Sequence, residues 1–134
     1  MISTKEILTK FKNVALVGAS GDLTKTSSVV MKYLQNSGFK VYPVNPNMKG
    51  QKILGEIVFG KISEIKSPVE IIDVFRPSNE AIEIAREAVQ IGAKVLWLQL
   101  KIKNEEAKKI IESNNMIYIE DKCTKIEIEK FINR

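Results

Sequence analysis

Short hydrophobic runs alternate along this chain with segments in which apolar residues recur every three or four positions. The continuous runs predict strands at residues 14–17, 40–44, 71–75, 94–98 and 116–119. The helical spacing predicts helices at about 3–11, 26–37, 78–92, 104–115 and from 124 onward. Residues 51–67 follow neither pattern clearly, although 57–59 could form a short extended piece. The chain therefore alternates between strands and helices over most of its length.

Capping signals support several of the predicted helix ends. Ser3 with Glu6, and Thr124 with Glu127, have the spacing of a capping box, in which each side chain binds the other residue's backbone. Gly38 and Gly92 stand where a left-handed residue commonly ends a helix. We therefore expect helices to begin at Ser3 and Thr124 and to end just before the two glycines.

Continuous apolar strands between amphipathic helices are typical of a parallel sheet that is covered on both faces. Right-handed crossovers then give a Rossmann-like, doubly wound α/β fold of about five strands. We expect one such domain over residues 1–134, with the helix within 1–12 packing on it. In this fold, ligands bind beyond the carboxyl ends of the strands, so the residues that leave each strand are the candidate site.

The exit of the first predicted strand has the composition of a phosphate-binding loop. Glycine allows a tight turn there, and the N-terminus of the next helix favours an anion. The candidate phosphate-binding residues are Gly18, Ala19, Ser20, Gly21 and Lys25, with hydroxyl donors at Ser20, Thr24, Thr26 and Ser27. The full dinucleotide fingerprint is absent, because Ser20 and Leu23 occupy two of its glycine positions. The alternative is an ordinary turn that needs glycine only for its shape.

The exit of the second predicted strand argues against ordinary NAD recognition. An acidic residue there would bind the ribose hydroxyls of NAD, but the chain has Asn45 followed by Pro46, with Lys49 and Lys52 beyond. A neutral and then basic exit favours a phosphorylated ribose, as in NADP or coenzyme A. The alternative is a proline-stiffened loop with solvated lysines.

Composition and charge exclude several classes of function. The net charge is +5, but the lysines are scattered and Arg occurs only at positions 76, 86 and 134, which does not predict nucleic-acid binding. No apolar stretch approaches the roughly 20 residues of a membrane helix. A signal peptide is not evident, and the single Cys123 excludes an internal disulfide, so we expect a cytoplasmic protein. Histidine is absent, which removes the commonest general base.

Six spaced motifs together resemble a known family. They occur in the order Val14–Ser20, Val41–Pro46, Leu54–Gly55, Asp73–Pro77, Trp97–Gln99 and Asp121–Cys123. From about residue 13 to 127 the chain resembles the stand-alone CoA-binding domain proteins. That family is similar to the CoA-binding N-terminal domain of the succinyl-CoA synthetase α subunit and of NDP-forming acyl-CoA synthetases.

The resemblance implies a site for coenzyme A. The residues that it implies for the CoA phosphates are Gly18, Ala19 and Ser20. The residues near the 3′-phosphoadenosine would be Asn45, Pro46 and Lys49, and those packing on the adenine or the pantetheine arm would be Phe75, Arg76 and Pro77. Gln99 and Cys123 would lie nearer the thiol end. The chain departs from the family's pattern at Lys101, where a glycine is common, and at Lys122, which replaces an arginine.

We therefore expect a small binding protein for coenzyme A or acyl-CoA that is not catalytic on its own, since it lacks the phosphorylated histidine of the synthetases. One alternative is an NADP-dependent oxidoreductase-type protein, and another is a regulatory or partner subunit of an acyl-CoA enzyme. A homo-oligomer is also consistent with the sequence. Cys123 could be a reactive thiol, but we favour a small buried residue. Asp73 and Trp97 are interpreted as structural.

Overall fold

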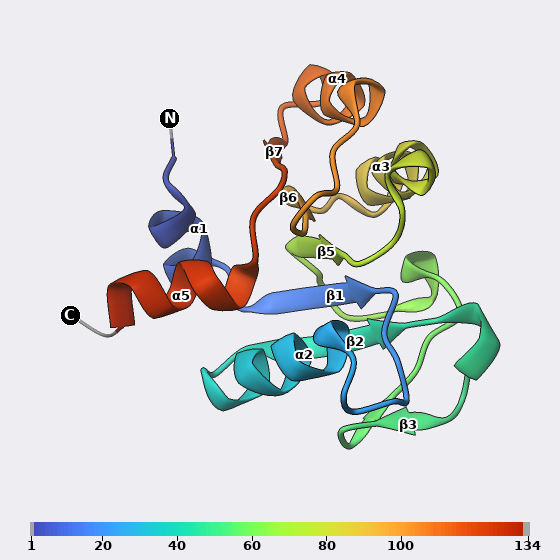
Figure 1. Cartoon of the computed structure of the whole chain (residues 1–134). Helices are drawn as coiled ribbons and strands as arrows, with labels where there is room; N and C mark the ends of the chain where they lie inside the picture. The colour runs from blue at the N-terminus through green and yellow to red at the C-terminus, as the bar shows by residue number, and fades with distance from the viewer. Residues whose placement is uncertain (1, 133–134) are drawn as a thin grey trace.

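The computed structural model describes residues 2–132, which form a five-stranded parallel sheet with helices on both faces (Figure 1). In sheet order, the strands are β2 (Lys40–Val44), β1 (Asn13–Val17), β5 (Ile71–Val74), β6 (Val95–Leu98) and β7 (Ile117–Ile119). The helices are α1 (Thr4–Lys10), α2 (Thr26–Asn36), α3 (Ala81–Ile91), α4 (Glu105–Ser113) and α5 (Thr124–Ile132). The arrangement confirms the predicted Rossmann-like α/β domain.

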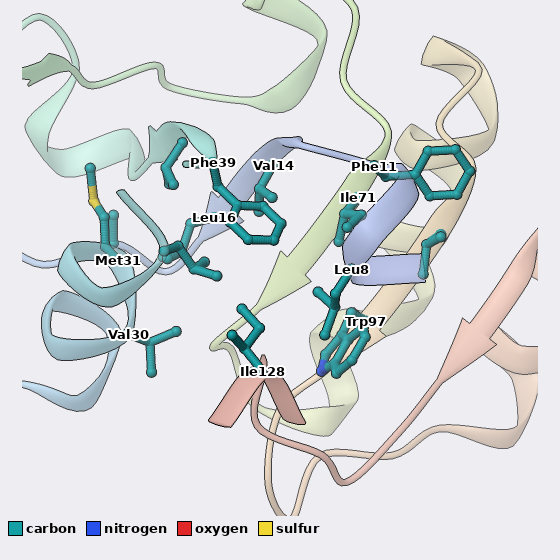
Figure 2. Close-up of a cluster of buried hydrophobic side chains, with 14 of the residues drawn as sticks. Leu8, Phe11, Val14, Leu16, Val30, Met31, Phe39, Ile71, Trp97 and Ile128 are labelled. Carbon is teal, nitrogen blue, oxygen red and sulfur yellow. The ribbon is translucent and has the colours of Figure 1, made fainter. Parts of the chain in front are cut away.

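The alternation of side chains along β1 explains why both faces of the sheet are covered. Val14 and Leu16 belong to one hydrophobic core with residues of α1, α2 and α5, whereas Ala15 belongs to a second core with residues of α3 and α4. Figure 2 shows the first core, to which Trp97 of β6 and Leu8 of α1 both belong. Trp97 is fully buried and its Nε1 donates to the Lys122 carbonyl at 2.8 Å, as expected of a structural residue.

Residues 51–67, which follow neither the strand nor the helix pattern clearly, contain a small antiparallel hairpin made of β3 (Lys52–Ile53) and β4 (Glu56–Ile57). Leu54 and Gly55 connect the two strands with φ angles of 48° and 84°, the left-handed geometry of a tight hairpin turn. Phe59 then pairs in parallel with Val44, so the chain after the hairpin returns to the edge strand β2. Residues 2–132 also contain three short 3₁₀ helices: η1 (Pro46–Met48), η2 (Ile62–Glu64) and η3 (Ser78–Glu80).

The two predicted capping boxes have different outcomes. Ser3 and Glu6 form the expected reciprocal bonds at the start of α1. At α5 the prediction is wrong, because Thr124 is already helical and its hydroxyl donates to Oδ2 of the buried Asp73 at 3.1 Å. Glu127 instead accepts from the Thr4 hydroxyl at 2.8 Å, which joins α5 to α1. The Thr124 hydroxyl thus binds the buried carboxylate of Asp73 and does not cap α5.

No helix among residues 2–132 combines the length and the apolar character needed to cross a bilayer. The helices are instead amphipathic and direct their apolar sides to the two cores.

Lys101, the position where the resemblance implies a glycine, has a backbone conformation that suits glycine. Its φ angle is 69°, in the left-handed region that a side chain disfavours, and its N–H donates to Asp121 Oδ1 at 2.7 Å. We predict that Lys101→Gly stabilises the protein by about 0.5–1 kcal/mol, because relief of backbone strain exceeds the entropy that glycine adds to the unfolded chain. Urea unfolding measures this change.

The matched control is Lys103→Gly, two residues further along the same exposed loop, where φ is not positive. That variant should be destabilised, because glycine relieves no strain there and only increases the entropy of the unfolded chain. Stabilisation by both substitutions, or by neither, would contradict the assigned cause.

Candidate functional site

A large open cleft of about 1330 Å³ lies at the carboxyl ends of β1, β2 and β5. From β1 the chain crosses to β2 on one side, and β5 follows on the other side of β1. This reversal in strand order leaves a crevice between the loops, which is the usual ligand position in such sheets. The cleft is lined by residues of segments 17–21, 25–27, 44–49, 60–64, 75–76 and 79–87.

The loop after β1 is held tightly against both neighbouring strands. Gly18 has a φ of +95°, and the N–H groups of Gly18 and Ala19 both donate to the Val44 carbonyl, at 3.1 and 3.2 Å. A Cβ on Gly18 would lie only 2.8 Å from the Phe75 carbonyl oxygen. Glycine is therefore required at this position both for its backbone conformation and for the close approach of β5.

The first turn of α2 opens into this cleft without a side-chain cap. Its N-cap residue, Lys25, has an extended backbone and accepts no capping hydrogen bond on its side chain. The N–H groups of Thr26 and Ser27 donate to no acceptor among residues 2–132, and both residues line the cleft. By contrast, α1 and α4 are capped by Ser3 and Asn104. The start of α2 thus offers backbone donors and a positive dipole end to an anion.

Asn45 connects two of the cleft's loops. Its Nδ2 donates to the Ala19 carbonyl at 2.8 Å, and its Oδ1 accepts from the Asn47 N–H, also at 2.8 Å. The loop after β1 and the helix η1 are therefore fixed to one another. Met48 of η1 adds a second contact, because a Cβ on Gly21 would lie 2.9 Å from the Met48 Cε.

Two cations of the cleft are paired with carboxylates. Arg76 donates from Nε and Nη2 to Glu80 at 3.0 and 2.8 Å, and Lys49 Nζ lies 3.0 Å from Glu64 Oε2. The hydrogen bonds from Arg76 lower the pKa of Glu80, and the bond from Lys49 lowers the pKa of Glu64. Both pairs are partly exposed, so solvent screens them and their effect on stability is small.

A buried polar cluster lies below the strand exits, outside the cleft lining. Asp73 of β5 is fully buried and accepts from Gln99 Nε2 and from the Thr124 hydroxyl. Burial raises the pKa of Asp73 to about 7, although the hydrogen bonds from Gln99 and Thr124 oppose the rise. The cluster joins β5 and the exit of β6 to the first turn of α5, in agreement with a structural role for Asp73.

All of the predicted site residues except three line the cleft. The residues brought together are Gly18, Ala19, Ser20, Gly21, Lys25, Asn45, Pro46, Lys49, Phe75 and Arg76. Pro77 lies outside the lining, while Gln99 is 4% exposed within the Asp73 cluster and Cys123 is 6% exposed in the first core. Cys123 therefore has the buried position that the sequence favoured.

Sequence reasoning missed one wall of the cleft. Glu80, Glu83 and Glu87 line it from η3 and α3, and Lys61 and Glu64 line it from the segment around η2. The spacing of the three glutamates at i, i+3 and i+7 was a usable signal, since it places them on one helix face. Burial raises the pKa of Glu87, the deepest of the three. The irregular segment 60–64 carried no comparable signal.

Comparison with known proteins identifies the family of this chain. The family model described as a CoA binding domain matches residues 12–129. The uncharacterized protein YneT of Bacillus subtilis (strain 168) is 35% identical over 122 residues, which cover 91% of this chain and 89% of that protein. A hypothetical protein from Pyrococcus horikoshii OT3 superimposes with a TM-score of 0.92 at 35% identity, over 96% of this chain and 89% of that one. The chain therefore belongs to the CoA binding domain family.

The fold also occurs as part of a larger enzyme. A dinucleotide-forming acetyl-coenzyme A synthetase from Ca. Korarchaeum cryptofilum matches with a TM-score of 0.66 at 24% identity. The match covers 80% of this chain but only 25% of the synthetase chain. At this identity the likeness establishes the shared fold.

Proposed function

We propose that this protein binds coenzyme A or an acyl-CoA in the cleft at the ends of β1, β2 and β5, and that it is a cytoplasmic binding module without a catalytic group of its own. The observation that carries the proposal is the uncapped start of α2 beside the Gly18 loop, inside a cleft of about 1330 Å³. The volume exceeds the roughly 300–1,000 Å³ of pockets for drug-sized ligands, so the cleft has room for a ligand as long as coenzyme A. Membership of the CoA binding domain family supports the same ligand.

The cleft supports separate positions for the phosphate groups of coenzyme A. The pyrophosphate would lie against the loop 18–21 and the N–H groups of Thr26 and Ser27. We assign Arg76 to the same phosphates, and not to the adenine or the pantetheine arm, because its Cδ lies beside Gly18. The 3′-phosphate would lie near Lys49, which directly follows η1. No carboxylate follows β2 directly, which disfavours the ribose diol of NAD. Phe75, in the cleft lining, and Pro77, outside it, remain proposed positions for packing on the adenine or the pantetheine arm. Gln99 and Cys123, both buried outside the lining, remain proposed positions nearer the thiol end.

A thermal-shift panel of CoA, acetyl-CoA, NAD, NADP, FAD and ADP tests the ligand class. We expect CoA and acetyl-CoA to stabilise the protein by about 2.7 kcal/mol at a concentration one hundred times their Kd, with smaller effects from the other compounds. Stabilisation by NADP without stabilisation by CoA would favour the oxidoreductase-type alternative and overturn the proposal. Mass spectrometry of small molecules released from the purified protein is an independent check.

We predict that Arg76→Ala weakens CoA binding about tenfold, because a charge-assisted hydrogen bond to a phosphate contributes about 1.5–3 kcal/mol. Arg86→Ala is the matched control, since Arg86 is also paired with a glutamate, Glu83, but does not line the cleft. Isothermal titration calorimetry should show unchanged affinity for the control. Equal effects of the two substitutions would mean that Arg76 acts only through net charge.

A further inference from the structure

Arg76 lies beside the proposed phosphate-binding loop, but the carboxylate of Glu80 binds its guanidinium. The side chain crosses Gly18 so closely that a Cβ there would lie 3.1 Å from Arg76 Cδ. Two parallel hydrogen bonds, from Nε and Nη2, then engage both oxygens of Glu80. This fork geometry is the one by which arginine binds a phosphate. Glu80 therefore accepts from the same Arg76 N–H groups that would otherwise donate to a ligand phosphate.

Lys49, which follows η1 in the cleft lining, is also held by a carboxylate. Its Nζ contacts Glu64 Oε2 at 3.0 Å, while Glu64 Oε1 accepts from the Gly60 N–H at 2.9 Å. The backbone thus fixes the carboxylate, and the carboxylate fixes the flexible lysine. Lys25 lines the cleft without a salt bridge among residues 2–132 and is available to an incoming anion.

We propose that Glu80 and Glu64 are built-in competitors for the ligand's phosphate groups, each holding one cation of the cleft until an anionic ligand displaces it. The inference rests on the proposed function, since it assumes that phosphates enter this cleft. Both pairs are partly exposed, with side-chain exposures of 47% and 44% for Arg76 and Glu80, so the exchange is energetically feasible. The carboxylates lower the affinity for the ligand, because a displaced glutamate stays beside the bound phosphate and repels it.

The test compares two glutamates of the same cleft wall by isothermal titration calorimetry with CoA. Glu80→Gln frees Arg76, whereas Glu83→Gln removes the same charge but frees Arg86, which does not line the cleft. We expect Glu80→Gln to tighten CoA binding about three- to fivefold and Glu83→Gln to change it less than twofold. This control separates displacement of a specific partner from a general change in the cleft's electrostatic field.

Glu64→Gln tests the second pair with two ligands. The glutamine can still accept from the Gly60 N–H, so the loop is retained, while Lys49 is released. We expect CoA to bind about threefold more tightly and dephospho-CoA, which lacks the 3′-phosphate, to bind as it does to the wild type. An equal gain for both ligands would overturn the assignment of Glu64 and Lys49 to that phosphate.

Failure of the competitor role is distinguishable from failure of the proposed function. If the wild type binds CoA and Glu80→Gln binds it no better than Glu83→Gln does, the competitor role is wrong and CoA binding stands. If neither the wild type nor any variant binds CoA, the proposed function is itself wrong.

Discussion

Gly18→Ala should destabilise this protein by about 3 kcal/mol and raise the Kd for CoA at least tenfold. A side chain at φ +95° costs about 1–2 kcal/mol, and a Cβ placed 2.8 Å from the Phe75 carbonyl adds the cost of an overpacked contact. The strain would be relieved only by moving the loop after β1 away from β5. That movement would displace the N–H groups proposed to bind the pyrophosphate.

Gly38→Ala isolates the backbone contribution to this effect. Gly38 has a nearly identical φ of +90°, but no atom lies within 4 Å of the position that its Cβ would take. We expect that variant to lose only about 1–2 kcal/mol in urea unfolding and to bind CoA like the wild type. Equal losses of stability in the two variants would show that the approach of Phe75 to Gly18 is not tight in solution.

Asp73→Asn should remove a large pH dependence of stability. Because burial raises the pKa of Asp73 to about 7, the folded protein binds a proton more tightly than the unfolded chain, in which the pKa is near 3.8. The stability contributed by this group is therefore full below about pH 4 and is lost as the pH rises through about 7. The two pKa values differ by about 3 units, and at 1.36 kcal/mol per unit the loss is about 4 kcal/mol.

The asparagine is nearly isosteric and carries no charge. Its oxygen can accept from Gln99, and its nitrogen can donate to the Thr124 hydroxyl oxygen, so the variant should be more stable than the wild type at pH 8 and similar at pH 4. Carboxylates with lowered pKa values, such as Glu64 and Glu80, lose their stabilising contribution only at lower pH and do so in both proteins. Urea unfolding from pH 4 to 8 measures the difference, and a slope that persists in Asp73→Asn would assign it to another group.

Local patterns in the sequence were sufficient for the sheet and for one side of the cleft. Apolar runs, followed by Gly18 in one case and by Asn45 and Pro46 in the other, located the ends of β1 and β2. Their exits do lie together because parallel strands share one carboxyl edge. The irregular segment after η1 was harder to predict from the sequence, because strands of only two residues leave almost no periodic pattern. Glu64, which holds Lys49, was missed for that reason.

The buried cluster shows what depends on three-dimensional pairing. Asp73 is in register with Trp97, so it faces the first core, and Gln99, two residues after Trp97, faces the same side. That register is not evident from either strand alone. The same cluster accounts for the wrong prediction at α5, because the capping pattern of Thr124 and Glu127 ignores a buried carboxylate that comes from a distant strand.

The central claim, that the uncapped start of α2 and the Gly18 loop bind the phosphates of coenzyme A, is tested most directly by an NMR titration of the labelled protein with CoA. The account predicts saturable binding, with the largest amide shifts at Gly18 to Gly21, Thr26 and Ser27. Absence of shifts at these amides, or shifts confined to the outer surface of α2 near Val29 and Leu54, would contradict it.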